Sequence, residues 1–205
     1  MAKKKRQKLN FSHLLVEAVL IVFTVTLALT LNEWRSNVKA NATKEKVLKN
    51  IVNEIESNKE DLIEKMNYHK ETSIRIRDYL NNDSLWSTLN PNSGIQAVSQ
   101  LMPQGILNPN LQSGAWNSAV LSGVVNSFEY ERLFVLSNLY QTQETGVNTT
   151  WKVITGFYSD YEAFNREKSK QVAMRFQLAI GELYNQEKSL LKDYDLALNA
   201  IELKD

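Results

Sequence analysis

LLVEAVLIVFTVTLALTL, residues 14–31, is an apolar run that holds a single charged residue, Glu17. A helix rises about 1.5 Å per residue, so this run, extended to Trp34, crosses a hydrocarbon core of about 30 Å. The residues before it form a basic tail, and those after it have an ordinary polar composition. We therefore predict a transmembrane helix over residues 13–34, between a tail over 1–12 and a domain over 35–205.

Two other structures also fit an apolar run near an N-terminus. A cleaved signal peptide carries a basic tail as well, and Thr26-Leu27-Ala28 offers a cleavage triplet. Its apolar core is usually shorter, whereas here apolar residues continue past the triplet to Trp34, an aromatic residue typical of membrane interfaces. A buried core helix is the remaining alternative, and such helices are rarely apolar on all faces over this length. The pattern favours an uncleaved signal-anchor.

Charge is distributed unevenly along the chain. The first ten residues hold five bases and no acid, and bases beside a span stay on the cytoplasmic side. The chain has 24 Lys and Arg and 23 Asp and Glu, so without the five tail bases the remainder carries a net charge of −4. The expected topology is a cytoplasmic N-terminus and an outer C-terminal domain. The lipid bilayer is an expected partner, and nucleic acid, which needs a basic surface, is not.

The composition predicts helices. The chain has seven Gly, three Pro and no Cys, which favours helix and excludes disulfides and thiolate metal sites. Residues 33–80 contain no Gly or Pro, and their apolar residues recur at helical spacing. These residues are Val47, Ile51, Ile55, Leu62, Met66, Ile76 and Leu80. A long stalk helix that continues the span is therefore expected.

The rest of the chain is divided by one region rich in turn residues. Residues 81–110 hold all three prolines, and we predict an irregular loop there with a short helix at 95–101. A short helix is expected over 111–122, and helices with an apolar stripe are expected from 127 to about 161 and from about 163 to 203. The predicted fold is all-α: one transmembrane helix, its stalk, and an antiparallel helical bundle.

The sequence contains no recognisable catalytic or metal-binding pattern. The two histidines, His13 and His69, are far apart and have no partner at metal-ligand spacing. No nucleotide-binding loop or hydrolase motif occurs. The charges clustered around Glu54 are expected to line a solvated helix face. We predict neither enzymatic activity nor a cofactor.

Glu17 is the most unusual residue of the predicted span. On a helix it shares a face with Ile21, Thr24 and Ala28, and Thr24 and Ala28 form a pair of small residues that permits close helix approach. This face is a candidate for association with a second copy or with another membrane protein. Three roles remain open for Glu17: packing in such an interface, reaching the head groups or staying protonated, and carrying a proton.

Aromatic residues between positions 116 and 161 suggest a candidate pocket. Trp116, Tyr130, Tyr140 and Trp151 recur there, and Arg132 lies beside Tyr130 as a candidate group for an anionic ligand. At helical spacing such aromatic residues more often form the core of the protein. Both interpretations remain open.

Several of these residues resemble a known family. Glu17 followed by ALTLNEW, residues 28–34, resembles the E…ALxxNxW membrane signature of the bacterial domain-of-unknown-function 6090 family. Its motif positions here are Glu17, Ala28, Leu29, Asn32 and Trp34.

Two later blocks carry the same resemblance. Residues 51–58, IVNEIESN, are similar to the family's L-x-x-E-(L/I)-x-x-N segment. Ala115-Trp116, Ser122-Gly123 and Tyr140-Gln141 resemble a second block. The resemblance implies a single-pass protein of the bacterial envelope with a helical outer domain, and it implies no catalytic residue. Together with the expected topology, this predicts an inner-membrane protein whose C-terminal domain lies in the periplasm.

Three functions are compatible with this sequence. The favoured one is an interaction or scaffold module, oligomeric through its span or stalk. The second is a sensory or small-molecule-binding domain that signals through a partner. The third is an accessory subunit of a proton-driven envelope complex, which rests on topology alone.

Overall fold

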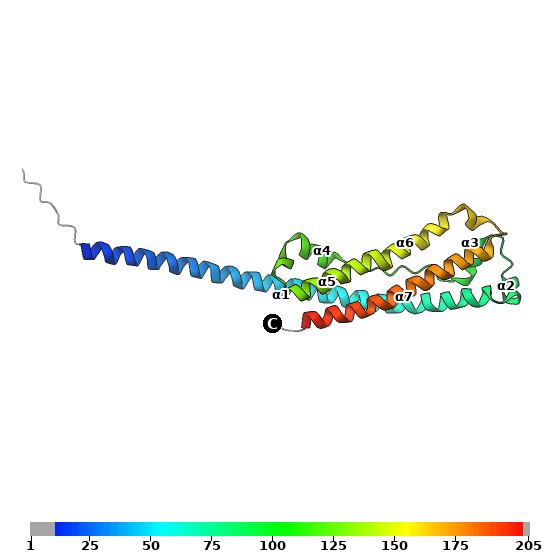
Figure 1. The fold of residues 1–205 in the computed structure, drawn as a ribbon, viewed down its shortest axis with the longest axis horizontal. Coiled ribbons are helices and arrows are strands. Elements are labelled where there is room, and N and C mark those ends of the chain that lie inside the picture. The colour runs from blue at the N-terminus through cyan, green and yellow to red at the C-terminus, as the bar shows by residue number, and fades with distance from the viewer. Residues whose placement is uncertain (1–10, 203–205) are drawn as a thin grey trace, which may run out of the picture. The chain divides into compact units, whose positions relative to one another are not determined.

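The computed structural model describes residues 11–202, which divide into two compact units with the boundary between Lys46 and Val47. The predicted basic tail over 1–12 lies outside the described residues except for its last two. The described chain is all-helical and contains no strand (Figure 1). One helix, α1 (Phe11–Leu80), contributes to both units.

The first unit is the N-terminal part of α1. Its side chains are exposed throughout residues 14–43, including every apolar residue of the run over 14–31. The hydroxyls of Thr24, Thr26 and Thr30 donate to backbone carbonyls three or four residues earlier, so these polar groups are satisfied within the helix. Among the described residues, α1 is the one helix with the length and composition to cross a membrane. Helix in this region, as predicted, is confirmed.

The second unit packs the rest of α1 against ten shorter elements. In chain order these are α2 (Asp83–Leu89), α3 (Gly94–Leu101), α4 (Gly114–Leu121), η1 (Val124–Ser127), α5 (Tyr130–Thr142), η2 (Gln143–Asn148), α6 (Thr149–Gly156), η3 (Phe157–Ser159), η4 (Tyr161–Phe164) and α7 (Ser169–Glu202). Figure 1 shows α5 and α7 alongside the later turns of α1, and α6 packs on α7. Contacts between α1 and α7 run in opposite residue order, from Lys59 with Asp195 to Ser73 with Gln177.

The core of this unit follows the apolar stripes of its long helices. Ile51, Ile55, Leu62 and Ile76 of α1 are fully buried, as their spacing predicted. From α7 the core takes Val172, Phe176, Ile180, Leu183, Leu190, Tyr194 and Ala197. Burial of these apolar side chains is the main force that holds the unit together.

Two helices occupy much of the segment predicted to be an irregular loop over 81–110. The side chain of Asn82 accepts a hydrogen bond from Leu85 N and begins α2, and that of Ser93 accepts one from Gln96 N and begins α3. Asn and Ser favour helix N-caps as strongly as turns, which explains why α2 was missed. The irregular part is shorter and later, and we call residues 102–113 the strap.

The long helix predicted from 127 to about 161 is divided in three. A π-helical turn, η2, lies between α5 and α6 and contains Gly146, a residue type that destabilises regular helix. It buries Gln143 and Val147 while Glu144 stays at the surface. π-Turns inserted into helices recur at functional sites.

Candidate functional site

A buried carboxylate, Glu54 of α1, organises one end of the second unit. One of its oxygens accepts from the backbone N–H of Ala115 at 2.7 Å, and the other accepts from Trp116 N at 3.3 Å and the Tyr140 hydroxyl at 2.8 Å. The first N–H groups of a helix lack helical partners and favour a negative charge, so Glu54 stabilises the start of α4. The prediction that Glu54 lies on a solvated face is wrong, because only 8% of the residue is exposed.

Trp116 and Tyr140 stack above this carboxylate. Their rings are nearly parallel, with an interplanar angle of 4° and centroids 5.2 Å apart. Burial raises the pKa of the Tyr140 hydroxyl, and the adjacent Glu54 raises it further. Tyr140 therefore keeps its proton and remains a hydrogen-bond donor to Glu54.

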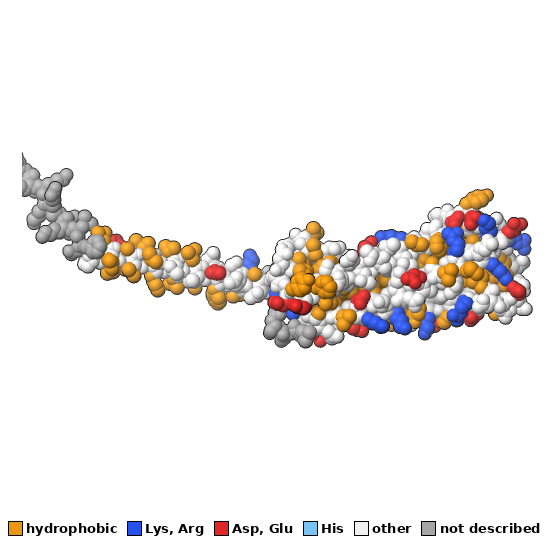
Figure 2. Space-filling model, in the orientation of Figure 1, with side chains coloured by type: hydrophobic (Ala, Val, Ile, Leu, Met, Phe, Trp, Pro, Cys, Tyr) orange, Lys and Arg blue, Asp and Glu red, His pale blue; other side chains and the backbone are white. Residues whose placement is uncertain are grey.

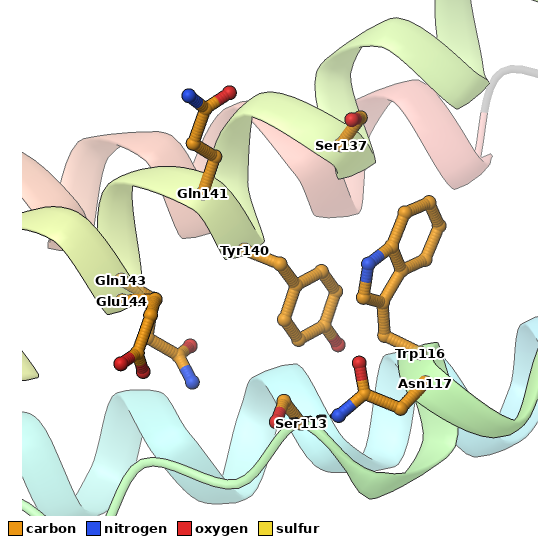
Figure 3. A pocket seen from close by; sticks show the side chains of 8 residues that line it. All are labelled: Ser113, Trp116, Asn117, Ser137, Tyr140, Gln141, Gln143 and Glu144. Carbon is orange, nitrogen blue, oxygen red and sulfur yellow. Dashed lines mark hydrogen bonds between the residues drawn. The ribbon is translucent and has the colours of Figure 1, made fainter. Parts of the chain in front are cut away.

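The two aromatic rings line a hollow of about 450 Å³ between α4 and α5 (Figure 3). Its other lining residues are Ser113, Asn117, Ser137, Gln141, Gln143 and Glu144. Asn117 Nδ2 donates to Ser113 Oγ at 3.1 Å, whereas the side chains of Ser137 and Gln141 make no hydrogen bond to the described residues. The hollow therefore offers uncharged donors and acceptors beside a flat aromatic wall.

The carboxylates at the hollow are already compensated. Glu54 has the three donors described above, and Glu144 pairs with Lys152 at 2.9 Å and accepts from Asn148 at 2.7 Å. These partners lower the pKa of Glu144, the Asn148 hydrogen bond most. The hollow is thus suited to uncharged groups.

An amide network supports the hollow from below. Asn58 of α1 donates to Gln112 O and accepts from Gln112 N, both at 2.7 Å. Gln143 of η2 donates to the same carbonyl at 3.1 Å and accepts from the Tyr194 hydroxyl at 2.8 Å. These buried groups satisfy one another, and such networks fix a single arrangement of the helices around them.

The strap is hydrogen-bonded along its length to α1. Just before the strap, Arg75 donates a hydrogen bond to Leu101 O. In the first half of the strap, Tyr68 donates to Gly105 O and His69 Nε2 contacts Leu107 O. In the second half, Asp61 accepts from Asn110 N and Asn58 accepts from Gln112 N. The backbone N–H and C=O groups of an irregular segment have no partners within a helix or sheet, so side chains of the neighbouring helix α1 supply the hydrogen bonds. The strap leads directly into α4 and so positions one wall of the hollow.

The surface beside the hollow is apolar. Val120, Leu121, Tyr130 and Phe134 are all exposed, Leu121 to 89%. On α4, Val120 and Leu121 lie three and four residues after Asn117, which lines the hollow, so they share its side of the helix. On α5, Tyr130 and Phe134 precede two other lining residues, Ser137 and Gln141, in steps of three or four residues. We call these seven residues, together with Ser113, the α4–α5 face. Figure 2 shows apolar side chains gathered over α4.

The α4 half of this face belongs to a long uncharged part of the chain. Between Asp83 and Glu129 there is no Asp, Glu, Lys, Arg or His, although 23% of the whole chain is charged. Depletion of charge is typical of the central part of protein interfaces. This pattern is visible in the sequence and is the signal that could have located the α4 half of the face in advance.

The structure brings together two of the five residues predicted for a pocket. Trp116 and Tyr140 line the hollow, whereas Tyr130 is exposed and stacks on Phe134 with centroids 6.3 Å apart. Arg132 is buried and donates to Ala200 O of α7 at 3.2 Å. Trp151 lines a separate hollow of about 230 Å³ beside strap residues 108–111. A single pocket made of all five residues is therefore wrong, because α5 and α6 present them on different faces.

Sequence reasoning missed Glu54 and Asn58 as site residues. Both lie on the apolar stripe between Ile51 and Leu62, where a solvated charge does not belong. That position on the stripe was the available signal.

The predicted membrane motif lies in the first unit. Glu17, Ala28, Leu29, Asn32 and Trp34 are all exposed on α1. Glu17, Ile21, Thr24 and Ala28 share a helical face by their spacing. Association through this face remains a prediction.

Over residues 11–202 no three His, Cys, Asp or Glu side chains are grouped so that they could hold a metal ion. The comparisons with known proteins add no assignment: no family model, curated protein or solved structure matches the chain.

Proposed function

We propose that this protein is a single-pass membrane protein that displays a helical interaction module, with the α4–α5 face as its docking surface. The apolar part of α1 supports the membrane anchor. An exposed apolar helix of this length needs lipid or other protein around it, and its threonine hydroxyls are already satisfied by its own backbone.

The proposed orientation places the basic tail in the cytoplasm and residues 35–205 outside, as an antiparallel helical bundle in the periplasm. The excess of bases before the span supports this orientation. The resemblance to the domain-of-unknown-function 6090 family supports the bacterial inner membrane as its location. Self-association through Glu17, Thr24 and Ala28 belongs to the same proposal.

The observation that carries the docking function is the composition of the α4–α5 face. Four exposed apolar side chains continue the same helix faces that supply the uncharged polar rim of the hollow. A polypeptide segment fits this arrangement, because its apolar side chains would cover Leu121 and Phe134 and its amide groups would bind in the hollow. With few charges on the face, this binding is expected to be insensitive to salt.

A photo-reactive amino acid at Leu121 in the full chain, in native membranes, tests this proposal. Tyr161 is the matched control, since both residues are 89% exposed. We expect a discrete cross-linked product from position 121 and none from 161, retained at high salt, with mass spectrometry identifying the partner. A Phe134→Glu change should abolish the product.

Equal labelling from positions 121 and 161 would mean that the face is ordinary surface. A product that contains a second copy of the chain would identify the module as self-associating. In that case Glu17→Leu and Ala28→Leu would test whether the span contributes.

A small-molecule-binding function is the second candidate. The volume of the hollow, about 450 Å³, lies within the range of ligand pockets. A ligand there would raise the unfolding temperature of the protein by mass action. A small molecule in the hollow would raise the unfolding temperature of the Leu121→Glu variant as well. A polypeptide that covers the α4–α5 face would instead bind that variant more weakly.

A further inference from the structure

A histidine and a glutamate are buried together where α1, α7 and the strap meet. His69 is 1% exposed and Glu187 is 0% exposed. The Nδ1 atom of His69 lies 2.9 and 3.0 Å from the two Glu187 oxygens, and its Nε2 atom lies 3.0 Å from the Leu107 carbonyl of the strap. The imidazole thus bridges α7 and the strap.

The hydrogen-bond partners determine how many protons this pair holds. A carbonyl only accepts, so Nε2 carries a hydrogen and donates to Leu107 O. In a neutral imidazole Nδ1 is then an acceptor and would face the carboxylate lone pairs. The contact at 2.9 Å therefore needs a second proton, either on Glu187 or on Nδ1. Both arrangements leave the pair with zero net charge.

The surroundings favour the neutral pair. Burial raises the pKa of Glu187, although its hydrogen bond with His69 opposes the shift. On α1, Lys65 lies one turn before His69 and pairs with Asp61, Lys70 and Glu71 are exposed, and Tyr68 lies edge-on to the imidazole. The strap carries no charged residue, and neither does α3. Lys152 of α6 is exposed and paired with Glu144.

We propose that His69 and Glu187 form a proton-binding site that locks the strap onto α1. Proton loss would leave a buried negative charge facing the Nδ1 lone pair, and the contact that joins the strap through His69 would open. The strap runs into α4, so the site links the ambient proton concentration to the order of the hollow. The proton site stands on this geometry and does not depend on the docking function.

The sign of the effect follows from the unfolded chain. There, carboxyl groups of glutamate ionise near about pH 4.3 and imidazoles lose their proton near about pH 6.5. Above about pH 6.5 the folded pair therefore holds one proton that the unfolded chain lacks, and stability falls as the pH rises until the folded pair itself ionises. One proton corresponds to a tenfold change in the unfolding equilibrium constant per pH unit.

The test compares the wild-type chain with Glu187→Gln, each as the full chain in detergent with His13→Asn to remove the second histidine. A glutamine amide can donate to Nδ1 without an ionisable proton. Between pH 6.5 and 8 we expect the unfolding equilibrium constant of the chain that retains Glu187 to rise with pH. Its increase per pH unit should exceed that of the Glu187→Gln variant by a factor of up to about ten. Glu182→Gln, an exposed site on the same helix, should keep the steep dependence.

Hydrogen exchange, corrected for its intrinsic pH dependence, gives the local readout. Strap amides such as Asn110 and Gln112 should lose protection above pH 7 in the wild-type chain and keep it in Glu187→Gln. Equal pH dependence of the two proteins in both measurements would overturn the proposal. If the variant does not fold, the protons released when the wild-type chain unfolds at pH 7.5 decide: about one supports the site, and none overturns it.

Discussion

Glu54 shows how a single residue fixes an interface between distant parts of the chain. It lies on the buried stripe of α1 and accepts hydrogen bonds from α4 and α5, about 60 and 86 residues away. Its environment cannot be predicted from its own helix, because a stripe identifies buried positions and not their partners. For this reason the sequence correctly predicted that Ile51 and Ile55 are buried, and wrongly predicted that Glu54 is solvated.

Glu54→Gln should destabilise the protein by about 2–3 kcal/mol. The amide NH₂ would face the N–H groups of Ala115 or Trp116 and leave buried donors without acceptors. The free energy of unfolding, measured by denaturant titration of the full chain in detergent, checks this. Glu56→Gln is the control at an exposed position and should change the free energy by less than about 0.5 kcal/mol. Similar values for the two variants would refute the role given to Glu54.

At the scale of elements, glycine explains how α3 approaches α7. A Cβ atom added at Gly94 would lie 2.7 Å from two side-chain carbons of Val172, closer than packed carbons come. The sequence placed α3 nearly correctly through its apolar spacing, but the close approach to α7 is a tertiary property. The same limit applies to η2, because a glycine such as Gly146 disfavours regular helix and does not predict a π-turn.

Gly94→Ala should therefore destabilise the protein by about 1–3 kcal/mol, because Val172 must shift in a packed core. Gly156→Ala is the matched control: no atom lies within 4 Å of its added Cβ. That change should be neutral or stabilise α6 by up to about 1 kcal/mol. Thermal unfolding of both variants in detergent checks the prediction. Tolerance of Ala at position 94 would contradict the packing of α3 on α7.

At the scale of the whole molecule, three features of the sequence were informative to different degrees. The apolar run and the helical stripes predicted an all-α chain with a long N-terminal helix, and the structure has both. The docking surface was not predicted, because it is made by α4 and α5 together and by the strap that holds α4. The long uncharged segment between Asp83 and Glu129, which holds the strap and α4, was the one visible trace of this surface in the sequence, and it does not reach α5.

The membrane anchor and its orientation are the central claim, and the absence of cysteine makes that claim directly testable. Single cysteines are introduced at Lys4, in the tail, and at the exposed Tyr161, and spheroplasts are treated with a membrane-impermeant maleimide. We expect the Tyr161→Cys protein, recovered with the membranes, to be labelled on intact spheroplasts and the Lys4→Cys protein only after lysis. Recovery of the full-length chain in the soluble fraction, or labelling in the reverse order, would contradict the account.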